Sequence, residues 1–206
     1  MEIETVVVGP IRTNCYLVSD GEELVVVDPG AEVNRIIDAL DGRAVKEIWV
    51  THRHQDHIGA LAALQDATGA PVAMSAVDAA LIEGKQVADG VDVCQGHEPA
   101  AIQRKLSEGD EVTVGPCTFE VIETPGHTEG SICYYCAGEH VLFAGDTLFA
   151  GGRYGRTDLE GGSFSAIVDS MKNKLSKLPD ETIVLSGHDQ RSNMMAERQF
   201  NEYLRG

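Results

Sequence analysis

Four side chains of metal-binding type occur within one short stretch of this sequence. The stretch from Thr51 to His57 contains His52, His54, Asp56 and His57. Imidazole nitrogens and carboxylate oxygens are ligands that zinc and other transition metals take from proteins. Three clustered histidines would gain nothing in an apolar core, because each buried polar nitrogen needs a partner. The spacing therefore predicts a metal site.

Three more potential ligands stand further along the chain, each after an apolar run and next to a glycine: His127, Asp146 and His188. Glycine lets the backbone turn sharply and approach a ligand closely. Ligand side chains at the carboxyl ends of strands occupy the usual position of an active site in an α/β protein. We therefore group these three residues with the first cluster.

Seven donors exceed what one four-coordinate zinc ion needs, so we expect two metal ions. Zinc is the first expectation, and iron or manganese would also suit imidazole and carboxylate ligands. Asp56 and Asp146 are the predicted catalytic carboxylates. We expect the donors to form a first triad, a second triad and a bridge: His52, His54 and His127; Asp56, His57 and His188; and Asp146 between them.

Such a centre predicts hydrolysis. Two metal ions about 3.5–4 Å apart would hold a bridging hydroxide and lower the pKa of its parent water toward neutrality. The same pair would polarise a carbonyl and stabilise the oxyanion of a tetrahedral intermediate. The sequence shows no G-x-S-x-G elbow, no phosphate-binding Walker loop and no convincing dinucleotide motif. A separate serine or cysteine nucleophile is not required.

The elements that must position these residues follow from the hydrophobic pattern. Predicted strands span residues 5–8, 14–18, 24–27, 47–50, 71–74, 111–114, 118–122, 131–135, 140–144 and 182–185. Predicted helices span residues 33–40, 58–64, 76–82, 164–178 and 193–204. Two groups of strands thus each carry their own helices. This predicts an α/β protein of two packed sheets with helices outside, in one domain over residues 1–206 with an irregular insertion around 84–108.

Charge and composition exclude several classes of partner. The chain has 16 Lys and Arg against 33 Asp and Glu, a net charge of −17. Binding to nucleic acid or to an anionic membrane depends on clustered cations, so we expect neither. No signal peptide or transmembrane run is evident, and the five scattered cysteines are expected to be reduced thiols in a cytoplasm. The oligomeric state stays open.

The sequence resembles the metallo-β-lactamase superfamily from about Thr5 to its C-terminus. The ligand motifs that carry the resemblance are His52-x-His54-x-Asp56-His57, Thr124-Pro125-Gly126-His127-Thr128, Gly145-Asp146-Thr147-Leu148-Phe149 and Gly187-His188. Three further stretches are similar to its glyoxalase II-like (hydroxyacylglutathione hydrolase-like) branch: Thr13-Asn14-Cys15-Tyr16-Leu17-Val18, Val27-Asp28-Pro29-Gly30 and Gly152-Arg153-Tyr154-Gly155-Arg156-Thr157-Asp158-Leu159.

The resemblance implies an αβ/βα four-layer sandwich of two mixed sheets with the dinuclear site between their ends. It also implies hydrolysis of acyl-thioesters, with S-lactoylglutathione or a related compound as substrate. Glyoxalase II carries a helical C-terminal domain that helps to hold glutathione, and we expect none after His188 here. Arg153, Tyr154 and Arg156 are candidates for contacts to substrate carboxylates. The alternative is loop packing, with an ion pair to Asp158.

Two alternatives to a thioester hydrolase stay open. A persulfide dioxygenase of the same fold shares the histidine cluster and a Gly-Arg-Thr-Asp stretch but uses one iron for oxygen chemistry. A metal-stabilised binding module would need no turnover, although structural metal sites are closed and usually rich in cysteine. A β-lactamase is less favoured, because Asp146 stands where those enzymes commonly have cysteine or serine. A nuclease is disfavoured by the net charge of −17.

Overall fold

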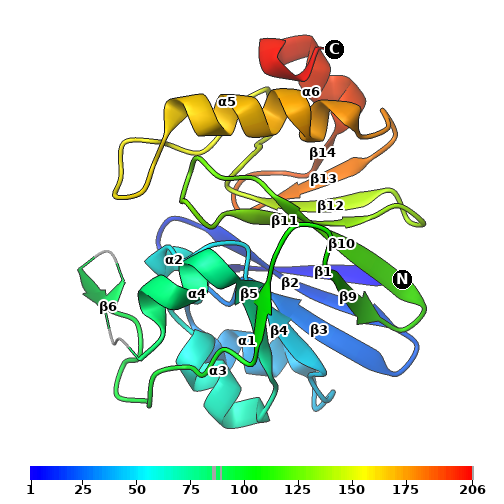
Figure 1. Cartoon of the computed structure of the whole chain (residues 1–206). Helices are drawn as coiled ribbons and strands as arrows, with labels where there is room; N and C mark the ends of the chain where they lie inside the picture. The colour runs from blue at the N-terminus through cyan, green and yellow to red at the C-terminus, as the bar shows by residue number, and fades with distance from the viewer. Residues whose placement is uncertain (85–86, 89, 206) are drawn as a thin grey trace.

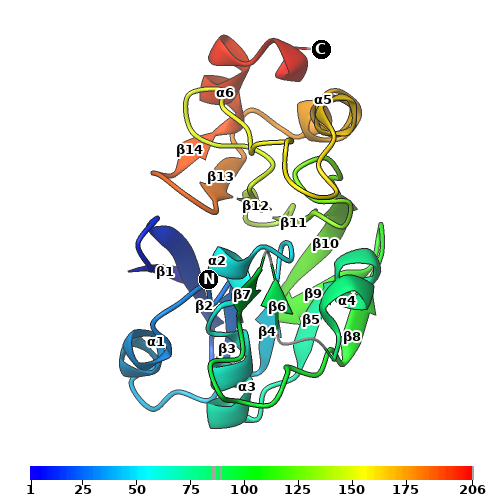
Figure 2. The same cartoon turned by 90° about the vertical axis from the view of Figure 1, so that its left-hand side faces the viewer.

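The computed structural model describes residues 1–84, 87–88 and 90–205. Two six-stranded sheets pack face to face, and helices cover the outer face of each sheet (Figure 1). The view in Figure 2 shows the four layers in succession, from α5 and α6 through both sheets to α1 and α3. The predicted αβ/βα sandwich of two mixed sheets is confirmed. Among the described residues, no helix is long and apolar enough to cross a membrane.

The first sheet comprises, in spatial order, β1 (Glu2–Val8), β2 (Thr13–Asp20), β3 (Glu23–Val27), β4 (Glu47–Trp49), β5 (Val72–Ser75) and β8 (Arg104–Leu106). Its first three strands are antiparallel, and β3, β4, β5 and β8 run parallel to one another. The helices of this half are α1 (Val33–Leu40), α2 (Gln55–Ile58), α3 (Leu61–Thr68) and α4 (Ala76–Ile82).

The second sheet comprises, in spatial order, β14 (Ser192–Asn193), β13 (Ile183–Ser186), β12 (Val141–Gly145), β11 (Ile132–Cys136), β10 (Cys117–Glu123) and β9 (Glu111–Val114). Strands β12 and β13 are parallel, and the other neighbours are antiparallel. Its helical elements are α5 (Phe164–Asn173), η1 (Leu175–Lys177), α6 (Met194–Phe200) and η2 (Glu202–Leu204).

Central strands are buried on both faces, as their apolar sequences require. In β3, Leu24 and Val26 pack toward the helices, while Val25 and Val27 pack between the sheets. This follows from the two-residue repeat of a strand. The same repeat separates Cys133 from Cys136, which point to opposite faces of β11. The Cys-x-x-Cys spacing in this strand therefore forms neither a metal site nor a redox pair.

Several boundaries differ from the prediction. The segment 84–108 is not wholly irregular, because β8 joins the edge of the first sheet and Val87–Ala88 pairs with Val91–Asp92 as β6 and β7. The predicted C-terminal helix is interrupted at Asn201. The Asn201 side chain accepts a hydrogen bond from Tyr203 N and donates one to Gly152 O. A side chain that bonds the local backbone in this way competes with helix continuation.

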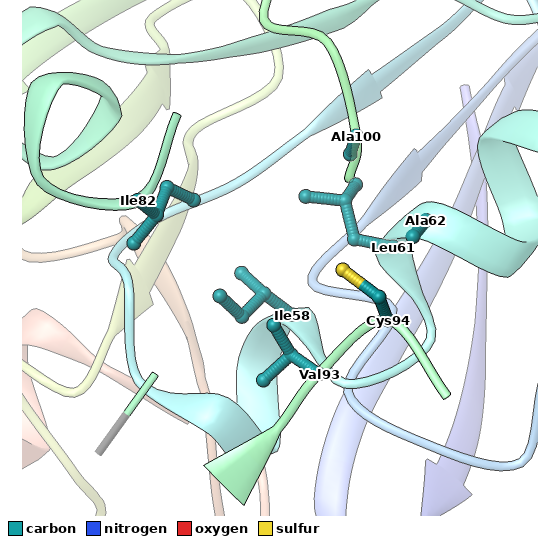
Figure 3. A pocket seen from close by; sticks show the side chains of 7 residues that line it. All are labelled: Ile58, Leu61, Ala62, Ile82, Val93, Cys94 and Ala100. Carbon is teal, nitrogen blue, oxygen red and sulfur yellow. The ribbon is translucent and has the colours of Figure 1, made fainter. Parts of the chain in front are cut away.

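A small apolar cavity lies next to α2, the helix that contains Asp56 and His57. It has a volume of about 20 Å³ and is lined by the side chains in Figure 3: Ile58, Leu61, Ala62, Ile82, Val93, Cys94 and Ala100. Ile58 follows His57 directly and is 2% exposed. The cavity leaves this side chain already short of contacts on one side.

We expect Ile58→Ala to lower the free energy of unfolding by about 2–5 kcal/mol, because the truncation removes buried methyl groups and enlarges an existing void. Chemical denaturation checks the value. Ile37→Ala is the matched control, since Ile37 is 37% exposed and its truncation should cost much less. Equal losses for the two variants would contradict the prediction.

Candidate metal centre

All seven predicted ligands come together at the strand ends. The ligand atoms of the first triad (His52, His54 and His127) lie within 4.8 Å of one another. Those of the second triad (Asp56, His57 and His188) do so as well. The structure thus brings four residues from one cluster together with residues far along the chain. A third group, His52, His57 and Asp146, meets the same criterion and connects the two triads. Which donors hold which metal ion stays a prediction.

Asp146 reaches both triads with one carboxylate. Its Oδ1 lies 3.3 Å from Nε2 of His57, and its Oδ2 lies 3.4 Å from Nε2 of His127. The same Oδ2 is 3.5 Å from Nε2 of His188. Within the first triad, Nδ1 of His54 and Nε2 of His127 lie 2.7 Å apart. The Asp146 carboxylate thus lies close to residues of both triads, and its role as a bridging ligand stays a prediction.

Asp28 orients two of the histidines, a role that its place in a turn motif did not reveal. Its Oδ2 accepts hydrogen bonds from Nδ1 of His57 at 2.8 Å and from Oγ1 of Thr51 at 2.7 Å. Since the Thr51 hydroxyl donates to Asp28, its oxygen accepts from Nδ1 of His52 at 3.0 Å. Both histidines therefore turn Nε2 toward the centre, as ligand histidines held by outer hydrogen bonds do.

The loop after β12 holds His127 through its backbone. Nδ1 of His127 donates to the carbonyl oxygen of Arg156 at 2.7 Å. Gly155 is required there, because a Cβ would lie 2.2 Å from the carbonyl oxygen of Asp146 and 2.7 Å from Nδ1 of His127. Arg156 thus holds His127 through its main-chain carbonyl oxygen. The side-chain type of Arg156 could not indicate this role.

The three predicted substrate-contacting side chains lie on that same loop. The Arg156 guanidinium pairs with Asp158 at 2.7 Å, and Arg153 pairs with Asp189 at 2.7 Å. The Tyr154 ring lies against other aromatic rings rather than against a ligand histidine. The ion pair to Asp158, which was the alternative interpretation of Arg156, is present. A substrate contact for these residues stays a prediction.

A glycine also shapes the second triad. A Cβ at Gly187 would lie 2.2 Å from Oδ1 of Asp146 and 2.5 Å from Cε1 of His57. The loop is held in place because Asn14 N donates to Gly187 O at 2.7 Å. Thr13 Oγ1 donates to Asp56 at 3.1 Å. The Gly187-His188 motif and the start of β2 therefore position the second triad together.

Buried polar atoms without hydrogen bonds mark the middle of the centre. Among the described residues, Nε2 of His52, Nε2 of His57 and Oδ1 of Asp146 have no hydrogen-bonding partner. Buried polar atoms of folded proteins are almost always satisfied, so such a cluster calls for an explanation. All three atoms point into the shared space of the two triads. The donor set fits two divalent metal ions, which would satisfy each of these atoms.

The electrostatics of the protein groups favour a cation. Burial alone would raise the pKa of the Asp56 carboxyl, but the nearby imidazoles of His188 and His57 hold this pKa well below its usual range. Burial disfavours charged His57, yet the carboxylates of Asp146 and Asp28 raise its pKa. Despite partial burial, the carboxylates of Asp146 and Asp56 raise the pKa of His188 to about 9. Ligand imidazoles must be neutral, so metal binding would displace these protons.

Comparison with known proteins identifies the family. The family described as the metallo-beta-lactamase superfamily matches residues 8–188. The chain belongs to the metallo-β-lactamase superfamily.

Relatives are similar along almost their whole length. A Bacillus subtilis protein named "Probable metallo-hydrolase YqgX" is 36% identical, over 97% of this chain and 95% of its own. The Haemophilus influenzae "Hydroxyacylglutathione hydrolase GloC" is 30% identical, over 99% of this chain and 98% of its own. With the donor set, these matches indicate a metal-dependent hydrolase.

Solved structures share the fold and the chain length of this superfamily member. The BLEG-1 B3 metallo-beta-lactamase superposes with a TM-score of 0.86 at 34% identity and covers 100% of both chains. TTHA1623 in a di-iron-bound form superposes with a TM-score of 0.85 at 35% identity, over 97% of this chain and 99% of its own. The second of these structures shows that a similar chain binds a pair of metal ions.

Proposed function

We propose that this protein hydrolyses acyl-thioesters such as S-lactoylglutathione in a metal-dependent reaction. The observation that carries the proposal is the pair of triads joined by Asp146. The hydroxyacylglutathione hydrolase of Haemophilus influenzae, 30% identical along nearly the whole chain, supports the choice of substrate class. Zinc is the proposed metal, and the di-iron form of TTHA1623 makes iron the first alternative.

The residues of this chain would hold the metal ions and present the substrate to them. The first triad, the second triad and bridging Asp146 would hold two divalent ions, which when bound supply a water of lowered pKa and a Lewis acid for the thioester carbonyl. Asp28 and Thr51 keep the proton of His57 and of His52 on the outer ring nitrogen. Water splits the thioester into a carboxylic acid and a free thiol.

The rim of the centre would position the thiol carrier. Arg153 and Arg156 have exposed side chains on the loop that holds His127. Their guanidinium groups are suited to carboxylates of a carrier such as glutathione, because a planar guanidinium donates in pairs. On this proposal a substrate carboxylate would replace Asp189 or Asp158 as the partner.

We expect the purified protein to contain close to two metal ions per chain and to release a thiol from S-lactoylglutathione. Metal analysis combined with a thiol-detection assay over a panel of acyl-thioesters tests both statements. The panel should include a persulfide, with oxygen uptake measured, and a β-lactam, because BLEG-1 is a B3 metallo-beta-lactamase. Oxygen uptake with the persulfide, and no thiol release from any ester, would identify a dioxygenase instead.

A further inference from the structure

Asp78 is a buried carboxylate that belongs to neither triad. It lies in α4 with no exposed surface, and its backbone N–H donates to Ser75 Oγ at the helix start. Its Oδ2 accepts hydrogen bonds from Arg53 N and Thr128 Oγ1, each at 2.8 Å. Its Oδ1 accepts from Arg53 Nη1 and Gly130 N, each at 3.1 Å. Both oxygens are therefore fully engaged.

The partners of Asp78 are sequence neighbours of the first triad. Arg53 stands between His52 and His54, and Thr128 follows His127 directly. One carboxylate thus ties together the two segments that supply all three imidazoles of that triad. In the second triad, Asp28 holds His57 and Thr13 holds Asp56.

The Arg53 side chain also contacts two further loop positions, Glu160 and Glu129. Its Nη2 donates to Glu160 O at 2.8 Å, and its Nη1 lies 3.3 Å from a carboxylate oxygen of Glu129. Glu129 is two residues from His127, and Glu160 lies on the loop whose Arg156 carbonyl holds that histidine. A buried ion pair adds little net stability, because desolvation of both charges offsets their attraction. The arrangement is thus better explained by positioning than by stability.

We propose that Asp78 is a positioning residue: through Arg53 and Thr128 it sets the spacing of His54 and His127, and so the metal affinity of the first triad. The second triad keeps its affinity without it. The inference rests on the metal centre of the proposed function and is independent of which substrate is hydrolysed.

The test is Asp78→Asn. In either orientation of the amide, its NH₂ group faces two hydrogen-bond donors. The two hydrogen bonds to that oxygen position are therefore lost, while the size of the side chain is kept. Loss of an outer partner of a ligand typically weakens metal binding about 10–100-fold. We expect the Kd of one of the two bound Zn²⁺ ions to rise at least about tenfold, and the Kd of the other ion to stay near its wild-type value. Competition titration of metal-depleted protein against a chromophoric chelator measures both equivalents.

Co²⁺ absorption spectra assign the weakened equivalent. With one Co²⁺ bound, Asp78→Asn should resemble His127→Ala, which lacks a first-triad ligand, and differ from His188→Ala, which lacks a second-triad ligand. Thr128→Val removes one of the bonds to Asp78 at constant size. It should weaken the same equivalent by a smaller factor, which keeps the proposal testable if Asp78→Asn folds poorly.

Glu47→Gln is the matched control. Glu47 is also a buried carboxylate, in β4, and it bonds to Trp49 Nε1 at 2.7 Å and to Arg104 at 3.0 Å. Neither of these bonds reaches a segment that supplies a ligand. It should leave both Zn²⁺ equivalents unchanged. Wild-type affinity for both equivalents in Asp78→Asn and Thr128→Val, or equal weakening of both, would overturn the inference. A wild-type protein that binds two Zn²⁺ ions and hydrolyses no thioester would instead contradict the proposed function alone.

Discussion

Asp146→Ala should abolish hydrolysis and lower the metal content of the purified protein. Asp146 lies 3.3 Å from His57 and 3.4 Å from His127, so its loss would remove the proposed ligand that the two metal ions share. Removal of a mere outer partner costs about 10–100-fold, and loss of a shared ligand should exceed this range in kcat/KM. The measurements are thiol release under saturating metal and the metal content after dialysis.

The control for Asp146→Ala is Asp66→Ala, which removes the same charge from a side chain that is 74% exposed. The control should retain both full turnover and full metal content. Normal activity in Asp146→Ala would show that the carboxylate does not bridge the triads. Loss of activity with two metal ions still firmly bound would show that Asp146 acts on the substrate rather than on the metal ions.

Chelation of the metal ions should abolish turnover and leave the protein folded. The apolar clusters lie between the sheets and beneath the helices, and each is formed by side chains other than the ligands. The metal should nevertheless stabilise the native state by linkage, by about 2.7 kcal/mol when free metal exceeds its Kd 100-fold. Circular dichroism of the metal-depleted protein checks the fold, and the midpoint of thermal unfolding should fall.

Restoration with single metals then identifies the active one. Zn²⁺, Fe²⁺ and Mn²⁺ added separately to metal-depleted protein should differ in the thioesterase activity that they restore, and we expect the highest from Zn²⁺. A different result is expected for a metal-stabilised binding module, since structural sites supply folding energy directly. If chelation unfolded the chain and no metal restored hydrolysis of any ester, that second interpretation would be correct.

The sequence predicted the fold, and it singled out the seven residues that the structure brings together, because both depend on local patterns. Apolar runs of strand length ending in a glycine and a ligand residue recur at His127, Asp146 and His188. Since strand ends of packed sheets meet at one edge, these residues could be grouped without coordinates. The number of donors predicted two metal ions, and the structure brings the atoms of both triads, and those of His52, His57 and Asp146, within 4.8 Å of one another. The assignment of each donor to one metal ion stays a prediction.

Other features depend on contacts that the sequence does not display. Strand β8 is Arg104-Lys105-Leu106, and its two charged residues conceal an edge strand that pairs with β5. Charged residues are common on edge strands because they oppose pairing with other chains. The role of Asp28 could have been inferred, since Asp28 directly follows β3, which runs parallel to β4, the strand that precedes the histidine cluster. The hydrogen bonds of Asp78 join segments far apart in the chain, and no sequence pattern indicated them.

Each triad is completed by both halves of the chain. His52 and His54 follow a strand of the first sheet, whereas His127 follows a strand of the second. In the second triad, Asp56 and His57 follow that same strand of the first sheet, and His188 follows a strand of the second sheet. A partly folded chain with one formed sheet would hold only incomplete sites, and such long-range contacts form late in folding. Bound metal ions would therefore cross-link the two sheets, so that neither can open locally without breaking coordination, and the sandwich would unfold as one cooperative unit.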